Sequence, residues 1–490
     1  MSSLNPGLRS DRSAGDAPPP LLPPVRPRWF LRVGERRFIL LLADLFAVVT
    51  VFAIFRLIPG LAEETGIFYN GFRAMLLIVG SWLTCASLLG LYQLRHVPNV
   101  ARLVLCVVMT GLIGSAFSPY LGFDFPKPES FPWRDYLALA ISFGLVRFLV
   151  SLLILSPTFS QKYLILGAGK AGLQIAEEIR GFNQRAGFTA FEIVGFVDDL
   201  HHENHHIVEG IPLVGPSEEL AALALKTEAS EVIVAIQESS RMRPETFAQI
   251  VVCRELGIPV TKMANLYEAL THRVPVEHAG RDLDAVMPLK RPLHHRIFLI
   301  FKRVFDLLCA VPGALLMLSF CPLIWLAQLL TKDRGPLFYS QIRVGLGGKL
   351  FEIVKFRSMR VNAEQAGAQW ASANDSRITP LGNFLRKSRI DELPQFWNVL
   401  KGEMSMVGPR PERPEFTSLL GREIPYYPAR HAVKPGLTGW AQVMYRYGAS
   451  IDDALIKLRY DLYYIKHQSV ALDVACLLKT FAVLVGLKGR

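Results

Sequence analysis

Long apolar stretches alternate with short polar segments over the first third of the chain. Four such stretches lie near residues 38–59, 74–93, 103–121 and 136–155. Each approaches the roughly 20 residues that a helix needs to cross the apolar core of a bilayer. Buried helices of a soluble protein are the alternative, but four long apolar runs in succession favour a transmembrane helical bundle over residues 38–156.

The segment before this bundle, residues 1–37, is rich in Pro, Ser and Arg and has no apolar run. This composition predicts a disordered tail. The tail carries seven arginines, whereas the first and third loops between the apolar stretches hold few cations, so the tail is expected in the cytoplasm. Four crossings would return the chain to the cytoplasm after about residue 157. Asp44, inside the first stretch, is expected to pair with another helix or to reach the membrane surface.

A glycine motif follows the bundle. A short apolar run at 162–166 leads directly into Gly167-Ala168-Gly169-Lys170-Ala171-Gly172, and a helical pattern continues through Arg180. Between a strand and a helix, G-x-G-x-x-G allows a diphosphate to approach the helix N-terminus closely. Gly167, Gly169 and Gly172 are therefore candidate nucleotide-binding residues.

The pattern after this motif predicts an α/β domain. Strands are expected at 191–197 and 231–236, with a helix at 217–226 between them, which indicates a Rossmann-like parallel sheet over residues 157–290.

The nature of any nucleotide bound by this domain stays open. Asp198 and Asp199 lie about 30 residues after the first glycine, whereas a ribose-binding acid is usual at about 20. There is no Tyr-x-x-x-Lys pair. A regulatory nucleotide and a purely structural domain are both compatible with the sequence.

A further apolar stretch begins after Lys302 and reaches about Leu330, with Pro312 and Pro322 inside it. Proline removes a helix hydrogen bond and bends the axis. We expect this segment to enter one leaflet, break at Pro322 and return. A straight fifth span is the alternative, but it would place the basic C-terminal domain outside the cell.

The densest chemistry lies in residues 386–412. Pro394 and Gly402 suit the start and the end of a helix, which places Asp391 and Glu392 at its beginning. The helix dipole stabilises ionised carboxylates there, and helix capping alone is one explanation for them. Adjacent carboxylates among cations also suit phosphoryl transfer, in which one attacks phosphorus and the other binds Mg²⁺.

Two upstream features could contribute cations. The segment 341–349 combines glycines with Arg343 and Lys349, and it suits either a loop near phosphates or a simple hairpin turn. Residues 351–359 alternate like a strand, so Lys355 and Arg357 are expected on one face. A solvated strand face is the usual explanation for such a pair.

Residues 302–490 resemble the bacterial polyprenyl-phosphate sugar-1-phosphate transferases, in their long form with four N-terminal spans and a Rossmann-like domain. The matching segments are Lys302-Arg303-x-x-Asp306, Lys355-Phe356-Arg357-Ser358-Met359, Asp391-Glu392-Leu393-Pro394-Gln395, Gly408-Pro409-Arg410-Pro411, Lys434-Pro435-Gly436-Leu437-Thr438-Gly439-Trp440 and Tyr460-Asp461-Leu462-Tyr463-Tyr464. In the family the membrane helix usually breaks at Ser-Pro, whereas this chain has Cys321-Pro322.

The resemblance implies a mainly α-helical, monotopic catalytic domain over residues 291–490, with a re-entrant membrane helix in the cytoplasmic leaflet of the bacterial inner membrane. It implies transfer of a hexose 1-phosphate, glucose or galactose being the leading sugars, from a UDP-sugar to undecaprenyl phosphate. Asp391 matches the family's nucleophile and Glu392 its Mg²⁺-binding carboxylate. Arg410 would contact a substrate phosphate. Further candidates for substrate binding are Lys355, Arg357, Arg389 and Asp461.

The charge distribution agrees with such a site. Of the 490 residues 51% are hydrophobic and 20% charged, and the net charge is +12. Residues 296–490 hold 27 Lys and Arg against 15 Asp and Glu, so all of the net charge lies there. We interpret it as the electrostatics of a phosphate site at a membrane surface. The aromatic and cationic residues at 459–466 fit a helix at that surface better than a nucleic-acid partner, which is not expected.

Two other functions remain as alternatives. A membrane-tethered NAD-dependent nucleotide-sugar dehydratase or epimerase would use the glycine motif, but it lacks the Tyr-x-x-x-Lys pair. A non-catalytic polysaccharide-assembly scaffold would not require the Asp391-Glu392 cluster. The expected partners are membrane lipids and the two substrates, and a homodimer is compatible with the sequence.

Overall fold

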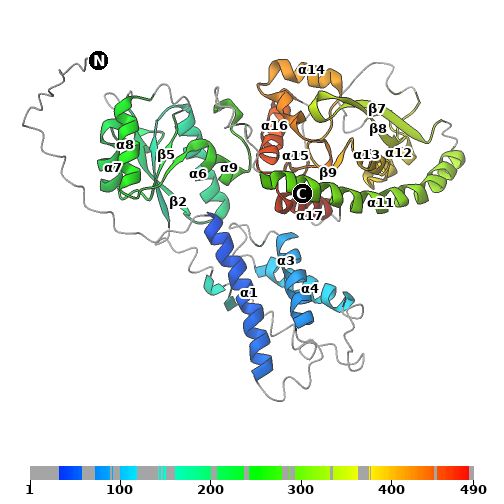
Figure 1. Ribbon diagram of the computed structural model, residues 1–490, viewed down its shortest axis with the longest axis horizontal. Coiled ribbons are helices and arrows are strands. Elements are labelled where there is room, and N and C mark those ends of the chain that lie inside the picture. The colour runs from blue at the N-terminus through cyan, green and yellow to red at the C-terminus, as the bar shows by residue number, and fades with distance from the viewer. Residues whose placement is uncertain are drawn as a thin grey trace, which may run out of the picture.

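The fold is described from a computed structural model of the chain. The structure describes residues 33–57, 72–88, 91, 100–117, 142, 145–146, 148–150, 160–199, 207–236, 242–278, 286, 293–331, 335–361, 363, 375, 377–445 and 450–484. In Figure 1 a helical N-terminal region extends away from two folded units that lie side by side.

Three long helices occupy the first part of the chain: α1 (Val33–Leu57), α3 (Phe72–Leu88) and α4 (Val100–Phe117). They overlap the first three predicted apolar stretches, and α3 packs against both α1 and α4. Helix α1 begins at Val33, so the predicted disorder of residues 1–37 was wrong for its last five residues, and residues 1–32 lie outside the described residues. Trp82 of α3 donates from Nε1 to Oδ2 of the buried Asp44 of α1 at 3.0 Å, which confirms the expected interhelical pairing. The fourth predicted stretch lies mostly outside the described residues.

Within the described residues, one helix is long and apolar enough to cross a membrane by itself, and it covers His295–Leu330. Phe38–Thr50 and Leu103–Ile113 are shorter apolar helical segments. The four-span bundle therefore stays a prediction.

The middle unit has a six-stranded mixed sheet in the order β3-β4-β2-β1-β5-β6. Its strands are β1 (Gln161–Leu166), β2 (Phe191–Val197), β3 (Ile207–Val208), β4 (Ile211–Gly215), β5 (Glu231–Val234) and β6 (Val260–Lys262). All neighbours pair in parallel except β3 and β4, which are antiparallel. The predicted Rossmann-like sheet is thus present with one antiparallel edge.

Helices cover both faces of this sheet, as Figure 1 shows. They are α6 (Lys170–Ala186), the short helix η4 (Ser217–Glu219), α7 (Leu220–Lys226), α8 (Pro244–Glu255) and α9 (Met263–Thr271). Side chains of α6 and α9 pack into one apolar cluster with the sheet, and side chains of α7 and α8 pack into a second. Successive β1 side chains therefore face opposite layers, as Ile165 and Leu164 do.

The C-terminal unit is mainly helical. It comprises α11 (Leu293–Leu330), β7 (Phe338–Val344), η7 (Leu346–Gly348), β8 (Leu350–Phe356), α12 (Pro380–Lys387), η8 (Ile390–Glu392), α13 (Gln395–Lys401), β9 (Ser405–Val407), α14 (Pro414–Glu423), η9 (Tyr427–Ala432), β10 (Gly436–Thr438), α15 (Trp440–Met444), α16 (Ile451–Lys466) and α17 (Val470–Leu484). Strands β7 and β8 form an antiparallel hairpin, so the glycines at 345–348 make its turn.

The helix α11 continues through both Pro312 and Pro322, so the prediction of a break at Pro322 was wrong. Each proline removes only one backbone donor, and the neighbouring turns keep their own hydrogen bonds. Figure 1 shows the helix curving toward its C-terminal end instead. The helix therefore bends but does not form a hairpin of two helices separated by a break.

Along much of its length, helix α11 packs against the C-terminal unit. Near its start, Lys302 Nζ forms an ion pair with Asp473 of α17 at 2.7 Å. Further along, the Gly313 backbone lies against the Phe396 ring, so a Cβ there would overlap the ring. Ile324, two turns before the end, belongs to an apolar cluster with Phe356 of β8 and Leu385 of α12. The helix thus lies along the C-terminal unit rather than leading away from it.

The middle and C-terminal units meet at α9 and α16. The buried carboxylate of Glu268 accepts from Lys466 Nζ and contacts His467 Nε2, both at 2.7 Å. Beside it, His272 Nδ1 lies 3.1 Å from the Tyr463 hydroxyl. The Trp440 indole donates to the carbonyl of His272 at 3.3 Å. A buried polar contact therefore joins the two units.

Candidate active site

Asp391 and Glu392 lie in the short 3₁₀ turn η8, between α12 and α13. Sequence reasoning placed them at the start of α13, but that helix begins three residues later, after Pro394. Arg389, at the head of the turn, has a left-handed φ of 61°, and the turn is closed by Leu393 N donating to Ile390 O at 3.1 Å. Helix α13 ends at Gly402, whose φ is 85°, as predicted.

Three cations converge on Glu392. Its Oε1 lies 3.5 Å from Arg410 NH2, 3.7 Å from Lys355 Nζ and 3.7 Å from Arg389 NH1. Burial opposes ionisation, but the charges of Arg410, Lys355 and Arg389 outweigh it and lower the pKa of Glu392. Glu392 is therefore an anion at neutral pH.

Asp391 differs from its neighbour because its side chain is buried and incompletely bonded. It is 6% exposed, and its Oδ1 has no hydrogen-bond partner among the described residues. Burial, followed by the charge of Glu392, raises its pKa. A buried oxygen without a partner costs stability, so its retention points to a functional role. A carboxylate of raised basicity and with a free oxygen can act as a nucleophile.

The electrostatics extend to the cations. Burial, followed by the charge of Arg410, lowers the pKa of Lys355 to about 8. Glu392, in turn, raises the pKa of the Arg410 guanidinium. The site therefore combines two permanent cations, Arg410 and Arg389, with Lys355, whose charge is lost in mildly alkaline solution.

Arg410 lies in the Gly408-Pro409-Arg410-Pro411 loop that follows β9. Gly408 N donates to Thr438 O at 2.9 Å, and Gly436 N donates to Pro409 O at 2.9 Å. A Cβ on Gly408 would overlap the carbonyl oxygen of Lys434, so only glycine permits this close approach of the two segments.

Arg357 and Arg389 occupy different surroundings. Arg357 is 5% exposed, and it donates from Nε to Pro336 O at 2.8 Å and from NH1 to Met359 O at 3.3 Å. Strand β8 ends at Phe356, so the alternation that should place Arg357 beside Lys355 stops one residue short. These two hydrogen bonds of Arg357 hold the main chain, whereas Arg389, with a side chain 58% exposed, is accessible beside Glu392.

Asp461 lies on α16, where it is 1% exposed and forms an ion pair with Arg430 at 2.8 Å. Arg430 also donates to the main-chain oxygen of Arg410 at 3.1 Å. Sequence reasoning missed Arg430 and its hydroxyl partner Tyr427. The available signal was Asp461 itself, because a carboxylate among apolar helix residues requires a buried cation.

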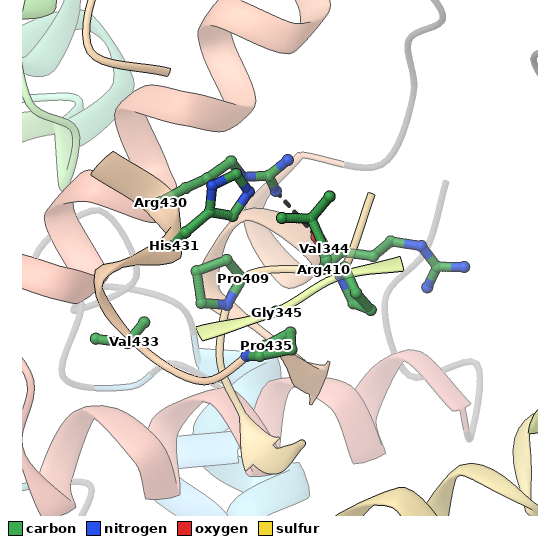
Figure 2. A pocket seen from close by; sticks show the side chains of 9 residues that line it. Val344, Gly345, Pro409, Arg410, Arg430, His431, Val433 and Pro435 are labelled. Carbon is green, nitrogen blue, oxygen red and sulfur yellow. Dashed lines mark hydrogen bonds between the residues drawn. The ribbon is translucent and has the colours of Figure 1, made fainter. Parts of the chain in front are cut away.

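A small pocket lies behind the Arg410 loop. Figure 2 shows the Arg430 guanidinium reaching the main chain of Arg410, while the Arg410 guanidinium extends away from it. The residues that line the pocket are Val344, Gly345, Pro409, Arg410, Pro411, Arg430, His431, Val433 and Pro435. Burial, followed by the charge of Arg430, lowers the pKa of His431 to about 4, so this histidine is neutral.

Asp391 and Glu392 are the carboxylates of this site that could serve as ligands of Mg²⁺. Among the described residues no group of three or more His, Cys, Asp or Glu side chains could hold a metal ion. Mg²⁺ often uses only one or two protein carboxylates and completes its shell with water and substrate phosphates. The unpartnered oxygen of Asp391 beside the ionised Glu392 fits that kind of shared site.

The glycine motif of the middle unit adopts the expected strand–loop–helix geometry. Gly167 has a φ of 106°, and a Cβ on Gly172 would overlap its carbonyl oxygen, whereas a Cβ on Gly169 would contact nothing. Ala168 N donates to Asp198 Oδ2 at 2.7 Å. Asp199 accepts from Ser217 N at 2.7 Å and from its hydroxyl at 2.8 Å. Both acids that were considered as ribose ligands thus accept hydrogen bonds from the protein.

Residues 297–486 match the family model described as Bacterial sugar transferase. The UDP-galactose-lipid carrier transferase of Erwinia amylovora is 30% identical over 421 residues, which cover 80% of this chain and 81% of that protein. The UDP-N-acetylgalactosamine-undecaprenyl-phosphate N-acetylgalactosaminephosphotransferase of Aeromonas hydrophila is 45% identical over 242 residues, 49% of this chain and 55% of that protein. The undecaprenyl-phosphate glucose phosphotransferase of Komagataeibacter xylinus is 34% identical over 361 residues, 71% of this chain and 64% of that protein. The chain thus spans between about half and two thirds of the length of the last two relatives.

Proposed function

Because this chain belongs to the bacterial sugar transferase family, we propose that it transfers a hexose 1-phosphate from a UDP-sugar to undecaprenyl phosphate. The products are UMP and undecaprenyl-diphospho-sugar, which begins the assembly of an exopolysaccharide, capsule or O-antigen. The observation that carries the proposal is the buried Asp391 oxygen, which has no hydrogen-bond partner in the part of the chain that the structure describes, beside a glutamate surrounded by three cations.

The reaction proceeds through a covalent intermediate on Asp391. An Asp391 oxygen attacks the phosphorus that bears the sugar, and the bond from that phosphorus to the bridging oxygen breaks, so that UMP leaves with the electron pair. An oxygen of undecaprenyl phosphate then attacks the same phosphorus. This second step forms the lipid diphosphate and returns the Asp391 carboxylate.

The cations of the site neutralise the phosphate charge that repels an attacking carboxylate. Arg410 contacts a substrate phosphate, Lys355 and Arg389 hold Glu392 ionised, and Glu392 would hold Mg²⁺. When bound, Mg²⁺ supplies charge neutralisation to the diphosphate and its leaving oxygen. Burial of Asp391 keeps bulk water from competing with the lipid acceptor.

The contacts of α11 support a position of this helix along the membrane surface. A helix of 36 residues is about 54 Å long, well beyond the roughly 30 Å of a bilayer core. Its polar and packing contacts extend over one unit from Lys302 to Ile324, while Leu308, Leu315 and Leu330 are more than 60% exposed. We infer that α11 lies in the cytoplasmic leaflet of the inner membrane, behind an N-terminal region that crosses it four times.

The decisive experiment measures UMP release by detergent-solubilised protein from a panel of UDP-sugars. Release should require polyprenyl phosphate and Mg²⁺, and labelled sugar phosphate should be trapped on the protein when the lipid is omitted. Asp391→Asn should trap no label, whereas Asp452→Asn, a matched change on the exposed start of α16, should behave as wild type. Full turnover by Asp391→Asn would contradict the mechanism.

A further inference from the structure

The carboxylate of Asp461 lies on α16, outside the turn that holds Asp391 and Glu392, and it is inaccessible to solvent. Asp461 is 1% exposed, and its Oδ2 receives Arg430 NH2 at 2.8 Å. A substrate phosphate or sugar cannot reach a side chain so buried. If Asp461 serves the reaction, it must act through the residue that it holds.

Arg430 joins three parts of the unit through one guanidinium. Its NH2 donates both to Asp461 and to the main-chain oxygen of Arg410, the latter at 3.1 Å. Its NH1 donates to the Tyr427 hydroxyl at 2.6 Å and lies 3.8 Å from Glu412. Figure 2 shows this guanidinium beside the main chain of the Arg410 loop. The side chain is 6% exposed, so its orientation is fixed by these partners.

The Arg410 loop depends on such external donors. Pro409 and Pro411 have no N–H groups, so they cannot donate the hydrogen bonds that would close the loop on itself. Instead, successive carbonyls accept from elsewhere: Pro409 O from Gly436 N at 2.9 Å, Arg410 O from Arg430, and Pro411 O from Arg343 NH1 at 3.1 Å. The central carbonyl, on the residue whose guanidinium contacts Glu392, is held by the cation that Asp461 neutralises.

We propose that Asp461 is a positioning residue that fixes the main chain of Arg410 through Arg430. The inference rests on the proposed function, because it concerns the guanidinium that meets the substrate phosphates. Removing the Asp461 charge leaves Arg430 buried without its closest anionic partner, and Arg430 then turns toward Glu412 and releases the Arg410 carbonyl. A displacement of about 1 Å at a phosphate-binding group can cost roughly 100-fold in rate.

The test is a double-mutant cycle on turnover. Asp461→Asn is measured in the wild-type chain and in the Arg410→Ala variant, with a UDP-sugar and undecaprenyl phosphate as substrates. We expect kcat to fall about 10- to 100-fold in the wild-type background and no more than about threefold in Arg410→Ala, because the group being positioned is already gone. Asp461→Glu, which keeps the charge, should recover part of the loss.

The matched control is Asp473→Asn. Asp473 is also a buried, ion-paired carboxylate, but its partners are Lys302, at 2.7 Å, and the Tyr464 hydroxyl, at 2.7 Å, rather than Arg410 or Arg430. Its loss should lower the melting temperature and change turnover by the same factor in both backgrounds. Equal factors for Asp461→Asn in the two backgrounds would show a merely structural role and overturn the inference.

Two further outcomes are decisive. If Asp461→Asn does not fold, the double variant Asp461→Asn/Arg430→Gln removes both buried charges, and full turnover by that folded variant would overturn the inference. A wild-type chain that releases no UMP from any UDP-sugar would contradict the proposed function and, with it, the inference. If the wild type is active but Asp461→Asn lowers kcat by the same factor in the wild-type and Arg410→Ala backgrounds, only the inference fails.

Discussion

Both the middle and the C-terminal unit hold a pair of adjacent acidic residues, Asp198-Asp199 and Asp391-Glu392, but the hydrogen bonding of the two pairs differs. In the middle unit, Asp198 accepts from Ala168 N and Asp199 accepts from Ser217. In the C-terminal unit, Asp391 keeps one oxygen, Oδ1, for which the described residues offer no hydrogen-bond partner. The comparison teaches that a phosphate-associated motif alone does not distinguish a structural loop from a reactive one. Here the two acidic pairs differ in their hydrogen bonds to the protein and in the three cations that surround Glu392.

The strongest way to break this comparison is to neutralise one acid in each loop. Asp391→Asn should lower kcat by about 10⁴-fold or more, because the carboxylate that attacks phosphorus is removed, while the melting temperature stays the same or rises. Asp198→Asn should leave kcat within about twofold of wild type. UMP release and thermal melts check both variants, and a large loss of kcat in Asp198→Asn would show that the middle loop takes part in the reaction.

The next largest effect is expected at Arg410. Arg410→Ala removes a guanidinium held 3.5 Å from Glu392, and we expect kcat to fall about 10²- to 10³-fold, the usual cost of one group that stabilises transition-state charge. Arg422→Ala, an exposed arginine near the end of α14, is the matched control and should change kcat little. Steady-state kinetics with a UDP-sugar measure both variants, and equal small effects would place Arg410 outside the reaction.

A smaller effect should appear in the pH profile. The pKa of Lys355 is lowered to about 8, so its ammonium is present below that pH and is lost as the pH rises through it. We expect kcat/KM to decline above about pH 8, approaching tenfold per unit for a single essential cation. Lys355→Arg should move this decline upward, since guanidinium stays charged. If kcat/KM of the variant declines at the same pH as that of the wild type, the decline belongs to a group other than Lys355.

The smallest effects on turnover are expected in the glycine motif. Gly172→Ala forces a Cβ into the Gly167 carbonyl, and we expect it to destabilise the middle unit by about 1–3 kcal/mol. Gly169→Ala meets no atom within 4 Å, so it should cost little stability. If the loop binds a nucleotide, Gly169→Ala should weaken that binding; calorimetric titration with nucleotides tests this prediction. If Gly169→Ala binds nucleotides as tightly as the wild type, Gly169 is not a nucleotide-binding residue.

Local patterns predicted the separate elements well. The strand at 191–197 and the helical segment at 217–226 follow from apolar periodicity. Helix α13 runs between Pro394 and Gly402 as expected, because proline and glycine act on the adjacent backbone alone. The same locality explains the error at Pro322. A proline signals a lost hydrogen bond, but whether a helix then breaks or bends depends on what packs beside it, here Phe356 and Leu385 against Ile324.

The residue types of the candidate site were predictable, but the different surroundings of its residues were not. Asp391 and Glu392 are adjacent in sequence, yet three cations contact Glu392 while Asp391 is buried with a free oxygen. Arg357, two residues after Lys355, was expected beside it and instead donates to the carbonyls of Pro336 and Met359. Such differences arise from segments distant in sequence, which a local pattern does not contain.

The sequence by itself determined the apolar stretches, the glycine loop, the order of the motifs and the location of all the net charge in residues 296–490. These are properties of neighbouring residues and of composition. Tertiary structure alone decided that Arg430 pairs with Asp461 and holds the Arg410 carbonyl, across 31 and 20 residues of chain. The physical reason is that burial and pairing of charges depend on which distant segments the fold brings within about 4 Å.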